Sequence, residues 1–228
     1  GASESRTFVT GNIKFDYTTP NGLVEKAKKF KKEFALDKQI WVAGSTHKGE
    51  EKIILDAHRR IMEAYPGTLL IIAPRRPERF QSVLNLIDKR GFSSVSRSKD
   101  IQISETTQVI LADTMGELPM YYSASSVSFV GGSFFKTGGH NLLEPASLGA
   151  PIITGPILFG VEEIANMLQA NDALEIIHDA EELSRIVCQL LSNSDQRQKM
   201  IKAARKVLDK NRGSVQKLLS LIVPLLKS

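Results

Sequence analysis

Cysteine is almost absent from this sequence of 228 residues: Cys188 is the single one, so no disulfide bond can form within the chain. A chain without disulfides fits a reducing setting such as the cytoplasm. No stretch approaches the roughly 20 apolar residues that a helix needs to cross a bilayer. The opening residues GASESRTF lack the basic and apolar regions of a signal peptide, and we expect a tag remnant ahead of a cut inside a longer protein.

Signatures of several common enzyme classes are also missing. The sequence has no G-x-x-x-x-G-K-[ST] motif and no G-x-G-x-x-G motif after the first apolar segment, which argues against ordinary P-loop NTPases and NAD enzymes. It has no G-x-S-x-G elbow, so a hydrolase triad is unsupported. Four histidines and one cysteine are scattered without metal-ligand spacing, and there is no Asp-x-Asp pair. We therefore expect no metal site and no cofactor.

The composition is that of a soluble globular protein, with 42% hydrophobic and 24% charged residues. The length suits one large α/β domain, alone or with a short appendage. A net charge of +5 fits an anionic partner such as a nucleotide, a phosphorylated lipid or an anionic membrane surface. Many proteins without such a partner carry the same charge, so this signal is weak alone.

Short apolar segments alternate with amphipathic ones along the chain. This order predicts parallel strands with right-handed helical crossovers, an α/β fold with a Rossmann-like sheet and helices on both faces. The expected strands are 39–43, 68–73, 109–112, 127–130, 151–154 and 173–177. The expected helices are 48–65, 78–90, 117–124, 141–148, 161–170, 180–192, 195–210 and 215–226.

Glycines, hydroxyls and charges follow four consecutive strands of this pattern. Carboxyl ends of parallel strands meet at one edge of the sheet, where ligands bind beside the point at which strand order reverses. The predicted site is therefore made of Ser45 and Thr46, of Arg75 and Arg79, of Met115, Gly116, Glu117 and Leu118, of Gly131, Gly132 and Ser133, and of Gly138, Gly139, His140, Asn141 and Glu144.

Each loop has a chemical interpretation and a structural alternative. Glycine pairs allow close backbone approach to a ligand, or they are plain turns. Arg75 and Arg79 suit a phosphate, or they form a solvated helix entry. Glu144 suits the cis-diol of a ribose, or it favours a helix N-terminus electrostatically. His47 and His140 suit structural hydrogen bonds better than catalysis. The joint pattern favours binding, because the structural alternatives do not predict polar loops at every strand end.

A basic stretch, KAKKFKK, precedes the first strand. Its Lys26, Lys28, Lys29, Lys31 and Lys32 suit an anionic membrane surface, or they form a solvated helix face.

Six segments carry a recognisable set of motifs. They are GNIKFD (11–16), AGSTHKGEE (43–51), APRRPERF (73–80), DTMGELPMYY (113–122), FVGGSF (129–134) and GGHNLLEPASLGAPIITGP (138–156). Together they resemble the C-terminal half of bacterial Kdo (3-deoxy-D-manno-octulosonic acid) transferases of lipopolysaccharide synthesis. The resemblance runs over most of residues 7–170, with the motifs in the same order and spacing.

The resemblance implies the donor-binding half of a GT-B glycosyltransferase that uses CMP-Kdo. Residues 1–20 would then be a tag remnant and interdomain linker, and residues 21–228 the CMP-Kdo-binding domain with its C-terminal helices. The N-terminal domain, absent here, would hold the lipid A precursor and the catalytic base at the cytoplasmic face of the inner membrane. This chain alone would be soluble, would bind donor weakly and would transfer nothing. No nucleic acid is implied as a partner.

The family motif also suggests roles for individual residues. Ser45 and Thr46 would line the donor cleft, Arg75 and Arg79 would meet the donor's negative charge, and residues 115–118 would pack on cytidine. Residues 131–133 would flank the phosphate or sugar, and Asn141 and Glu144 would hold the far end of the donor, with Glu144 on the ribose. The sequence departs from the family where Arg76 replaces a common histidine, which puts a role for Arg76 in doubt.

Two other functions are compatible with the same residues. A UDP-sugar-dependent GT-B transferase or epimerase would carry similar glycine-rich loops and a ribose-binding glutamate. A non-catalytic interaction module of the same fold would keep the loops and bind no nucleotide.

Overall fold

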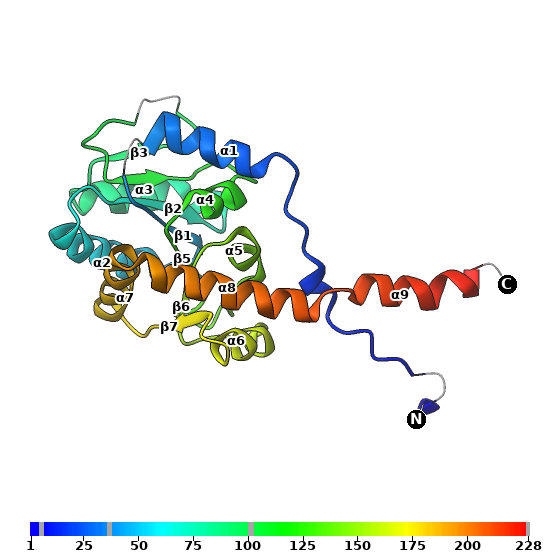
Figure 1. Cartoon of the computed structure of the whole chain (residues 1–228). Helices are drawn as coiled ribbons and strands as arrows, with labels where there is room; N and C mark the ends of the chain where they lie inside the picture. The colour runs from blue at the N-terminus through cyan, green and yellow to red at the C-terminus, as the bar shows by residue number, and fades with distance from the viewer. Residues whose placement is uncertain (5–6, 36–37, 100–102, 227–228) are drawn as a thin grey trace.

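In the computed structural model, one parallel sheet with helices on both faces forms the body of the protein (Figure 1). The structure describes residues 1–4, 7–35, 38–99 and 103–226. Within these residues the sheet has seven strands in the order β3-β4-β2-β1-β5-β6-β7. They are β1 (Ile40–Thr46), β2 (Leu69–Pro74), β3 (Ser94–Ser96), β4 (Val109–Leu111), β5 (Val127–Val130), β6 (Ile152–Thr154) and β7 (Leu174–Ile176).

Helices cover the two faces because alternate strand residues point to opposite sides. On β1, Trp41 and Ala43 pack into one apolar cluster with α2, α3 and α7, while Ile40 and Val42 pack into another with α1 and α4. A third cluster joins α5, α6 and α8 to β6 and β7. The helices are α1 (Leu23–Phe30), α2 (Glu50–Ala64), α3 (Phe80–Lys89), α4 (Leu118–Ala124), α5 (Leu143–Leu148), α6 (Glu162–Gln169), α7 (Ala180–Ser192), α8 (Ser194–Asn211) and α9 (Ser214–Ile222).

The strand order reverses between β1 and β5. From β1 the chain moves through β2, β3 and β4 to one edge of the sheet, then returns to place β5 beside β1 and continues outward to β7. A crevice for ligands is expected outside the carboxyl ends of the strands at such a point. The loops that follow β1, β2, β4 and β5 all begin at this edge of the sheet, as the sequence pattern predicts.

The predicted α/β fold is confirmed, with differences at element boundaries. Strand β3 was not predicted, because it is three residues long and has no apolar run. Helix α5 begins at Leu143 rather than Asn141; Asn141 lies in the turn before it, where its side chain accepts a hydrogen bond from the Leu143 amide (3.0 Å). The last predicted helix divides into α9 and a 3-10 turn, Val223–Leu226, that contains Pro224.

The final helix lies apart from the body. Figure 1 shows α9 projecting away from the sheet beside the N-terminal segment. Among the described residues, no helix combines the length and the apolar character needed to cross a bilayer.

A buried histidine links the sheet to α2. The His58 ring accepts a hydrogen bond from the Trp41 indole at Nδ1 (3.1 Å), and its Nε2 lies 3.0 Å from the Gln108 carbonyl oxygen. Nδ1 is therefore the acceptor and Nε2 carries the proton, so the ring is neutral. Burial lowers the pKa of His58 to about 4.

We expect this histidine to make the fold less stable in acid. Between about pH 6.5 and pH 4 the unfolded chain binds a proton that folded His58 does not, so stability falls as pH falls, by about 3 kcal/mol at the limit. Urea unfolding from pH 7 to 4 measures this loss. His58→Gln keeps a donor and an acceptor without a titrating ring, so its curve should be flatter; identical pH dependence in both proteins would contradict the prediction.

Candidate functional site

A cavity of about 290 Å³ opens at the carboxyl ends of β1, β2 and β4, beside the point where strand order reverses. Six predicted site residues line it, and five further residues complete its wall. The lining residues are Ser45, Ala73, Pro74, Arg75, Ala112, Thr114, Met115, Gly116, Leu118, Tyr121 and Glu144. The structure thus brings together residues from four segments that are far apart in the sequence: the end of β1, the end of β2 with the loop after it, the loop after β4 with the start of α4, and the start of α5.

The end of β1 is bent to form one wall of this cavity. Ser45 has φ of 55°, in the left-handed region that non-glycine residues seldom adopt, and the β1–β2 register shifts between Gly44 and Thr46. A side chain at Gly44 would collide with the Tyr122 hydroxyl, so the strand and α4 approach closely here. Such local strain persists where neighbouring packing holds it, often at ligand sites.

The two predicted arginines are used differently. Arg75 is exposed at the cavity, and among the described residues its guanidinium has no hydrogen-bond or carboxylate partner. Arg79 instead makes a two-point contact with the buried Glu51 carboxylate (2.7 and 2.9 Å) and donates to the Thr46 carbonyl (3.3 Å). The Thr46 hydroxyl donates to the same carboxylate (2.7 Å). Arg79 and Thr46 therefore brace the loops, and Arg75 faces the open cavity.

The glycine-rich loop after β5 is bound to a carboxylate of the protein itself. Glu50, the first residue of α2, is buried and accepts hydrogen bonds from the amides of Gly132 (2.8 Å), Ser133 (2.9 Å) and Phe134 (3.1 Å). It also accepts one from the His47 amide (2.8 Å). These loop amides, which the sequence placed beside the donor's phosphate or sugar, already have an anionic partner.

Close packing explains the two glycines of this loop. A Cβ at Gly131 would lie 2.8 Å from the Ser45 carbonyl oxygen, and Gly132 has φ of 78° and faces the Gly138 carbonyl. The Ser133 hydroxyl donates to the Val130 carbonyl (3.1 Å) and accepts from the Gly155 amide (2.8 Å). Residues 131–133 thus pack closely between the start of α2 and the ends of β5 and β6.

Two histidines join the next loop to the end of β1. The Nε2 atoms of His47 and His140 are 2.7 Å apart and the rings stack at 5.0 Å. Burial lowers the pKa of both rings, to about 4 for His140, so one neutral ring donates to the other. Gly138 has φ of 84°, and Gly139 donates to the Phe159 carbonyl (3.1 Å). The segment 138–140 lies beside the cavity without lining it.

The predicted loop 115–118 presents its tip to the cavity and turns Glu117 inward. The Glu117 carboxylate accepts hydrogen bonds from Thr114, Tyr121 (3.0 Å) and Arg97 (3.2 Å). Burial alone would raise the pKa of Glu117, but these hydrogen bonds outweigh it and the pKa lies below its ordinary value. Glu117 therefore shapes the loop, while the exposed Met115 and Gly116 lie at the cavity mouth.

Glu144 contributes the one carboxylate of the cavity lining among the described residues. Burial raises its pKa above the ordinary value, and a hydrogen bond from the Tyr17 hydroxyl, at 3.5 Å from Oε1, opposes that rise. Asn141 lies in the turn just before α5, where its side chain accepts a hydrogen bond from the Leu143 amide. The cavity therefore has an unpartnered guanidinium and a carboxylate as its charged groups.

Sequence reasoning missed several residues that this geometry uses. Thr114 and Tyr121 line the cavity, Glu50 and Glu51 anchor its loops, and Tyr17 reaches Glu144. The acidic pair at the start of α2 was a signal for the anchors, since two adjacent buried carboxylates need partners. Nothing local in the sequence marks Tyr17, because its partner is 127 residues away.

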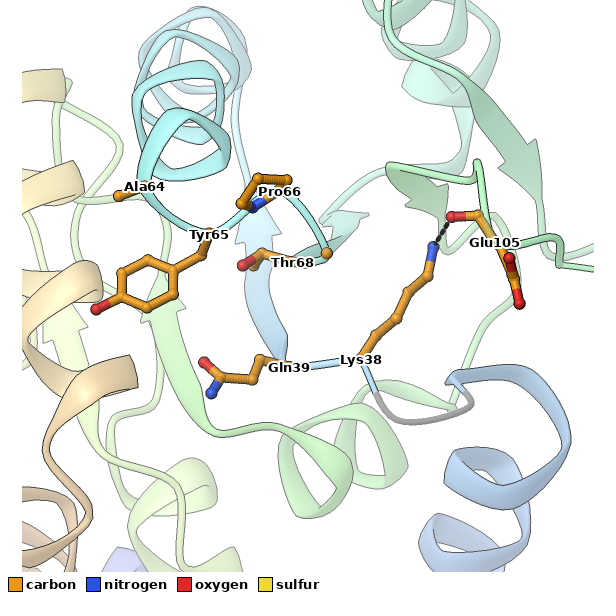
Figure 2. Close-up of a pocket in the computed structure, with 8 residues that line it drawn as sticks. Lys38, Gln39, Ala64, Tyr65, Pro66, Thr68 and Glu105 are labelled. Carbon is orange, nitrogen blue, oxygen red and sulfur yellow. Dashed lines mark hydrogen bonds between the residues drawn. The ribbon is translucent and has the colours of Figure 1, made fainter.

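A larger cavity, of about 580 Å³, lies at the opposite end of the sheet, beside the amino ends of β1 and β2. Figure 2 shows Tyr65, Pro66 and Thr68 on one side and Lys38 and Glu105 on the other. The Lys38 ammonium already donates to the carbonyls of Ser104, Glu105 and Thr107 (2.8 Å for Thr107). Its cationic group is thus satisfied, and the cavity lies away from the strand-order reversal.

Comparison with known proteins places this chain in a family. A family model described as glycosyl transferases group 1 matches residues 37–207, which include every residue that lines the cavity at the carboxyl edge. The chain belongs to the glycosyl transferases group 1 family. The expected GT-B type of parallel sheet is confirmed by this match.

The chain is 42% identical over 228 residues to 3-deoxy-D-manno-octulosonic acid transferase of Haemophilus influenzae, matching 100% of this chain and 53% of that protein. It is 32% identical to the Bordetella pertussis enzyme of the same name, over 92% of this chain and 50% of that protein. The chain thus spans about half the length of these relatives. They confirm the resemblance to Kdo transferases that the motifs indicated.

A solved structure of a related domain has the same fold as this chain. The C-terminal CMP-Kdo binding domain of WaaA from Acinetobacter baumannii is 33% identical, with a TM-score of 0.79 over 82% of this chain and 98% of that chain. WaaG, a glycosyltransferase involved in lipopolysaccharide biosynthesis, shares the fold at 15% identity, with a TM-score of 0.58 over 87% of this chain and 49% of that chain.

The pairing of Arg79 with Glu51 should dominate the stability of the loops. Removing Arg79 leaves the Glu51 carboxylate, 1% exposed, without its charge partner. We expect Arg79→Ala to lower the free energy of unfolding by about 3–5 kcal/mol. The matched control is Arg76→Ala, whose pair with Glu78 is exposed and should change stability by less than about 1 kcal/mol. Equal effects in urea denaturation would contradict this role.

Proposed function

We propose that this chain is the donor-binding domain of a Kdo transferase and that the cavity at the carboxyl edge holds the nucleotide of CMP-Kdo. One observation carries the proposal: a single cavity joins an unpartnered guanidinium, Arg75, to a half-buried carboxylate, Glu144. A nucleotide needs these two groups, a cation for phosphate and an acceptor for the ribose hydroxyls. The similarity to a domain described as CMP-Kdo binding supports this choice of donor.

The cavity's chemistry suggests how the nucleotide lies. Glu144 would accept the ribose diol, Arg75 would meet the phosphate, and Met115 and Gly116 would pack on the cytosine. Its volume of about 290 Å³ is near the lower end of small-molecule sites, roughly 300–1,000 Å³, which suits the nucleotide part of the donor. The Kdo sugar would then project from the open side toward the acceptor.

The two buried glutamates, Glu50 and Glu51, limit where the phosphate of the donor can bind. Glu50 already occupies the amides of Gly132 and Ser133, and its negative charge disfavours a phosphate against that loop. Glu51 likewise neutralises Arg79. Arg75 is thus the cation left to stabilise the charge that develops on departing CMP, an electrostatic effect worth several kcal/mol in preorganised sites.

The reaction we propose is a direct transfer without metal. A base in the half of the relatives that this chain does not span removes the proton from an acceptor hydroxyl of the lipid A precursor. The hydroxyl oxygen forms a bond to the anomeric carbon of Kdo, and the bond between that carbon and the phosphate oxygen breaks. CMP leaves with the electron pair, its charge met by Arg75. This chain alone would bind donor and transfer nothing.

Nucleotide titration by NMR tests the site and its specificity. We expect CMP to shift the amide signals of Ser45 and Gly116 more strongly than UMP does. Arg75→Ala should weaken CMP binding about 10- to 100-fold, because a charge-assisted contact to phosphate is lost. Arg76→Ala, an exposed neighbour that does not line the cavity, is the matched control.

Other outcomes of that titration would favour the alternative functions. A preference for UMP would indicate a UDP-sugar transferase or epimerase. No shift with either nucleotide at millimolar concentration would sink the donor-site proposal and favour a non-catalytic module. Tolerance of Glu144→Ala by the full-length protein's activity would support that module too.

We also propose that the basic face of α1 and the following turn rests on an anionic membrane at the cytoplasmic side. Leu23, Ala27 and Phe30 are buried in the cluster that contains α4, so the lysines point outward. All five lysines of the stretch KAKKFKK are exposed, and the Lys29 Nζ atom lies 3.7 Å from Oε1 of Glu33. The exposed set is Lys26, Lys28, Lys29, Lys31 and Lys32.

Vesicle binding tests the membrane contact. Each basic residue near an anionic surface contributes about 1 kcal/mol, so replacing Lys28, Lys31 and Lys32 with glutamine should weaken binding to phosphatidylglycerol vesicles on the order of 100-fold. The control replaces Lys199, Lys202 and Lys206 on the exposed side of α8, which removes the same charge. Equal losses in the two variants would show a net-charge effect and reject the α1 surface.

A further inference from the structure

The segment 11–17, which contains the GNIKFD motif, lies outside the cavity yet is firmly attached to the body. Phe15 is 1% exposed and packs into the cluster of α5, α6 and α8. The Asn12 side chain caps this turn, accepting from the Lys14 amide (3.0 Å). The motif therefore forms a fixed strap across the surface.

Asp16 ties the strap to the junction of α8 and α9. Its carboxylate accepts hydrogen bonds from the amides of Gly213 (2.6 Å) and Val215 (2.7 Å), and these bonds hold its pKa below the ordinary value. On the other side of the turn, a Cβ at Gly11 would lie 2.5 Å from the Ser214 hydroxyl. Gly11 and Asp16 of the motif thus both contact the short connection between α8 and α9, where the strap crosses it.

This attachment brings the next residue to Glu144, which lines the cavity. Tyr17 follows Asp16 directly, and its hydroxyl donates toward Glu144 Oε1 at 3.5 Å. Burial, then the nearby Glu144 charge, raises the pKa of Tyr17, so the phenol keeps its proton and can only donate to the carboxylate. Among the described residues, no other side chain donates a hydrogen bond to the Glu144 carboxylate.

We propose that Tyr17 is a positioning residue of the donor site: the strap holds its hydroxyl on Glu144, and that contact orients the carboxylate for the ribose diol. This inference rests on the proposed function. A carboxylate has about four acceptor positions on its two oxygens, so Tyr17 and both hydroxyls of a diol can be bound at once.

The contact also lowers the pKa of Glu144 and so favours its charged form, the form that accepts from both hydroxyls of a diol. The groups around it are Tyr17 from the strap, Tyr121 and Tyr122 from α4, and Arg75 from the loop after β2. Burial favours protonation of Glu144, and the Tyr17 hydrogen bond opposes it. Without Tyr17, the carboxyl group should take up a proton at higher pH.

The experiment compares Tyr17→Phe with the unaltered chain, using CMP and 2′-deoxy-CMP as probes. We expect Tyr17→Phe to weaken CMP binding about fivefold to tenfold and 2′-deoxy-CMP binding much less, so that discrimination between the two falls. In the unliganded protein, the carboxyl ¹³C signal of Glu144, assigned with Glu144→Gln, should titrate at higher pH in the variant. A purely structural role of Tyr17 would alter neither the discrimination nor this titration.

Two further variants test whether the effects are specific to Tyr17 and to its attachment by the strap. Tyr65→Phe removes the same hydroxyl at the opposite end of the sheet, beside the cavity of Figure 2, and should change nothing measured at Glu144. Asp16→Asn keeps the Tyr17 hydroxyl but weakens the strap's attachment, and should shift discrimination and titration in the same direction as Tyr17→Phe, by less.

The outcomes separate this inference from the proposed function. If the unaltered chain does not bind CMP, the donor site itself is rejected. If the unaltered chain binds CMP and Tyr17→Phe shows equal discrimination and the same Glu144 titration, the donor site stands and the role of Tyr17 is overturned. Equal weakening of both nucleotides, with no change in titration, overturns it as well.

Discussion

The buried carboxylate of Glu50 accepts hydrogen bonds from four backbone amides, and the arrangement of the candidate site depends on that contact. It joins the first turn of α2 to the glycine-rich loop after β5, across the point where strand order reverses. A buried anion is costly unless its acceptor positions are filled, so the loop is held tightly in this one conformation. Gly131 packs directly against this contact, because a Cβ there would lie 2.8 Å from both the Glu50 carboxylate and the carbonyl oxygen of the bent residue Ser45.

The neighbouring buried carboxylate, Glu51, also binds groups of the protein itself, and this determines which arginine faces the cavity. Glu51 takes the guanidinium of Arg79 and the hydroxyl of Thr46, which leaves Arg75 as the free cation at the cavity. Glu117 similarly collects Thr114, Tyr121 and Arg97 to shape the loop that carries Met115. Glu144 stands apart because Tyr17 is the one side-chain donor to its carboxylate among the described residues, so acceptor positions stay available on that group.

Much of the fold and part of the site could be predicted from residue patterns. Alternating apolar strands and amphipathic helices have a strong local signal, and strand ends of a parallel sheet must share an edge. Ser45, Arg75, Met115, Gly116, Leu118 and Glu144 were placed together on that basis, and they line one cavity. Strand β3 was missed because three edge residues carry no periodic signal. Glu50 and Tyr17 were missed because their partners lie 82 to 84 and 127 residues away.

By itself, the sequence determined the order of strands and helices, the edge of the sheet where polar loops gather, and the motifs shared with Kdo transferases. Those features depend on local composition and spacing, which a linear pattern contains. Only the tertiary structure decided which charges serve the fold and which face the cavity: Arg75 and Arg79 look alike in the loop APRRPERF, and so do Glu50 and Glu51 in KGEE. Their roles separate because hydrogen bonding depends on distances of about 3 Å between segments remote in the chain, and folding alone sets those distances.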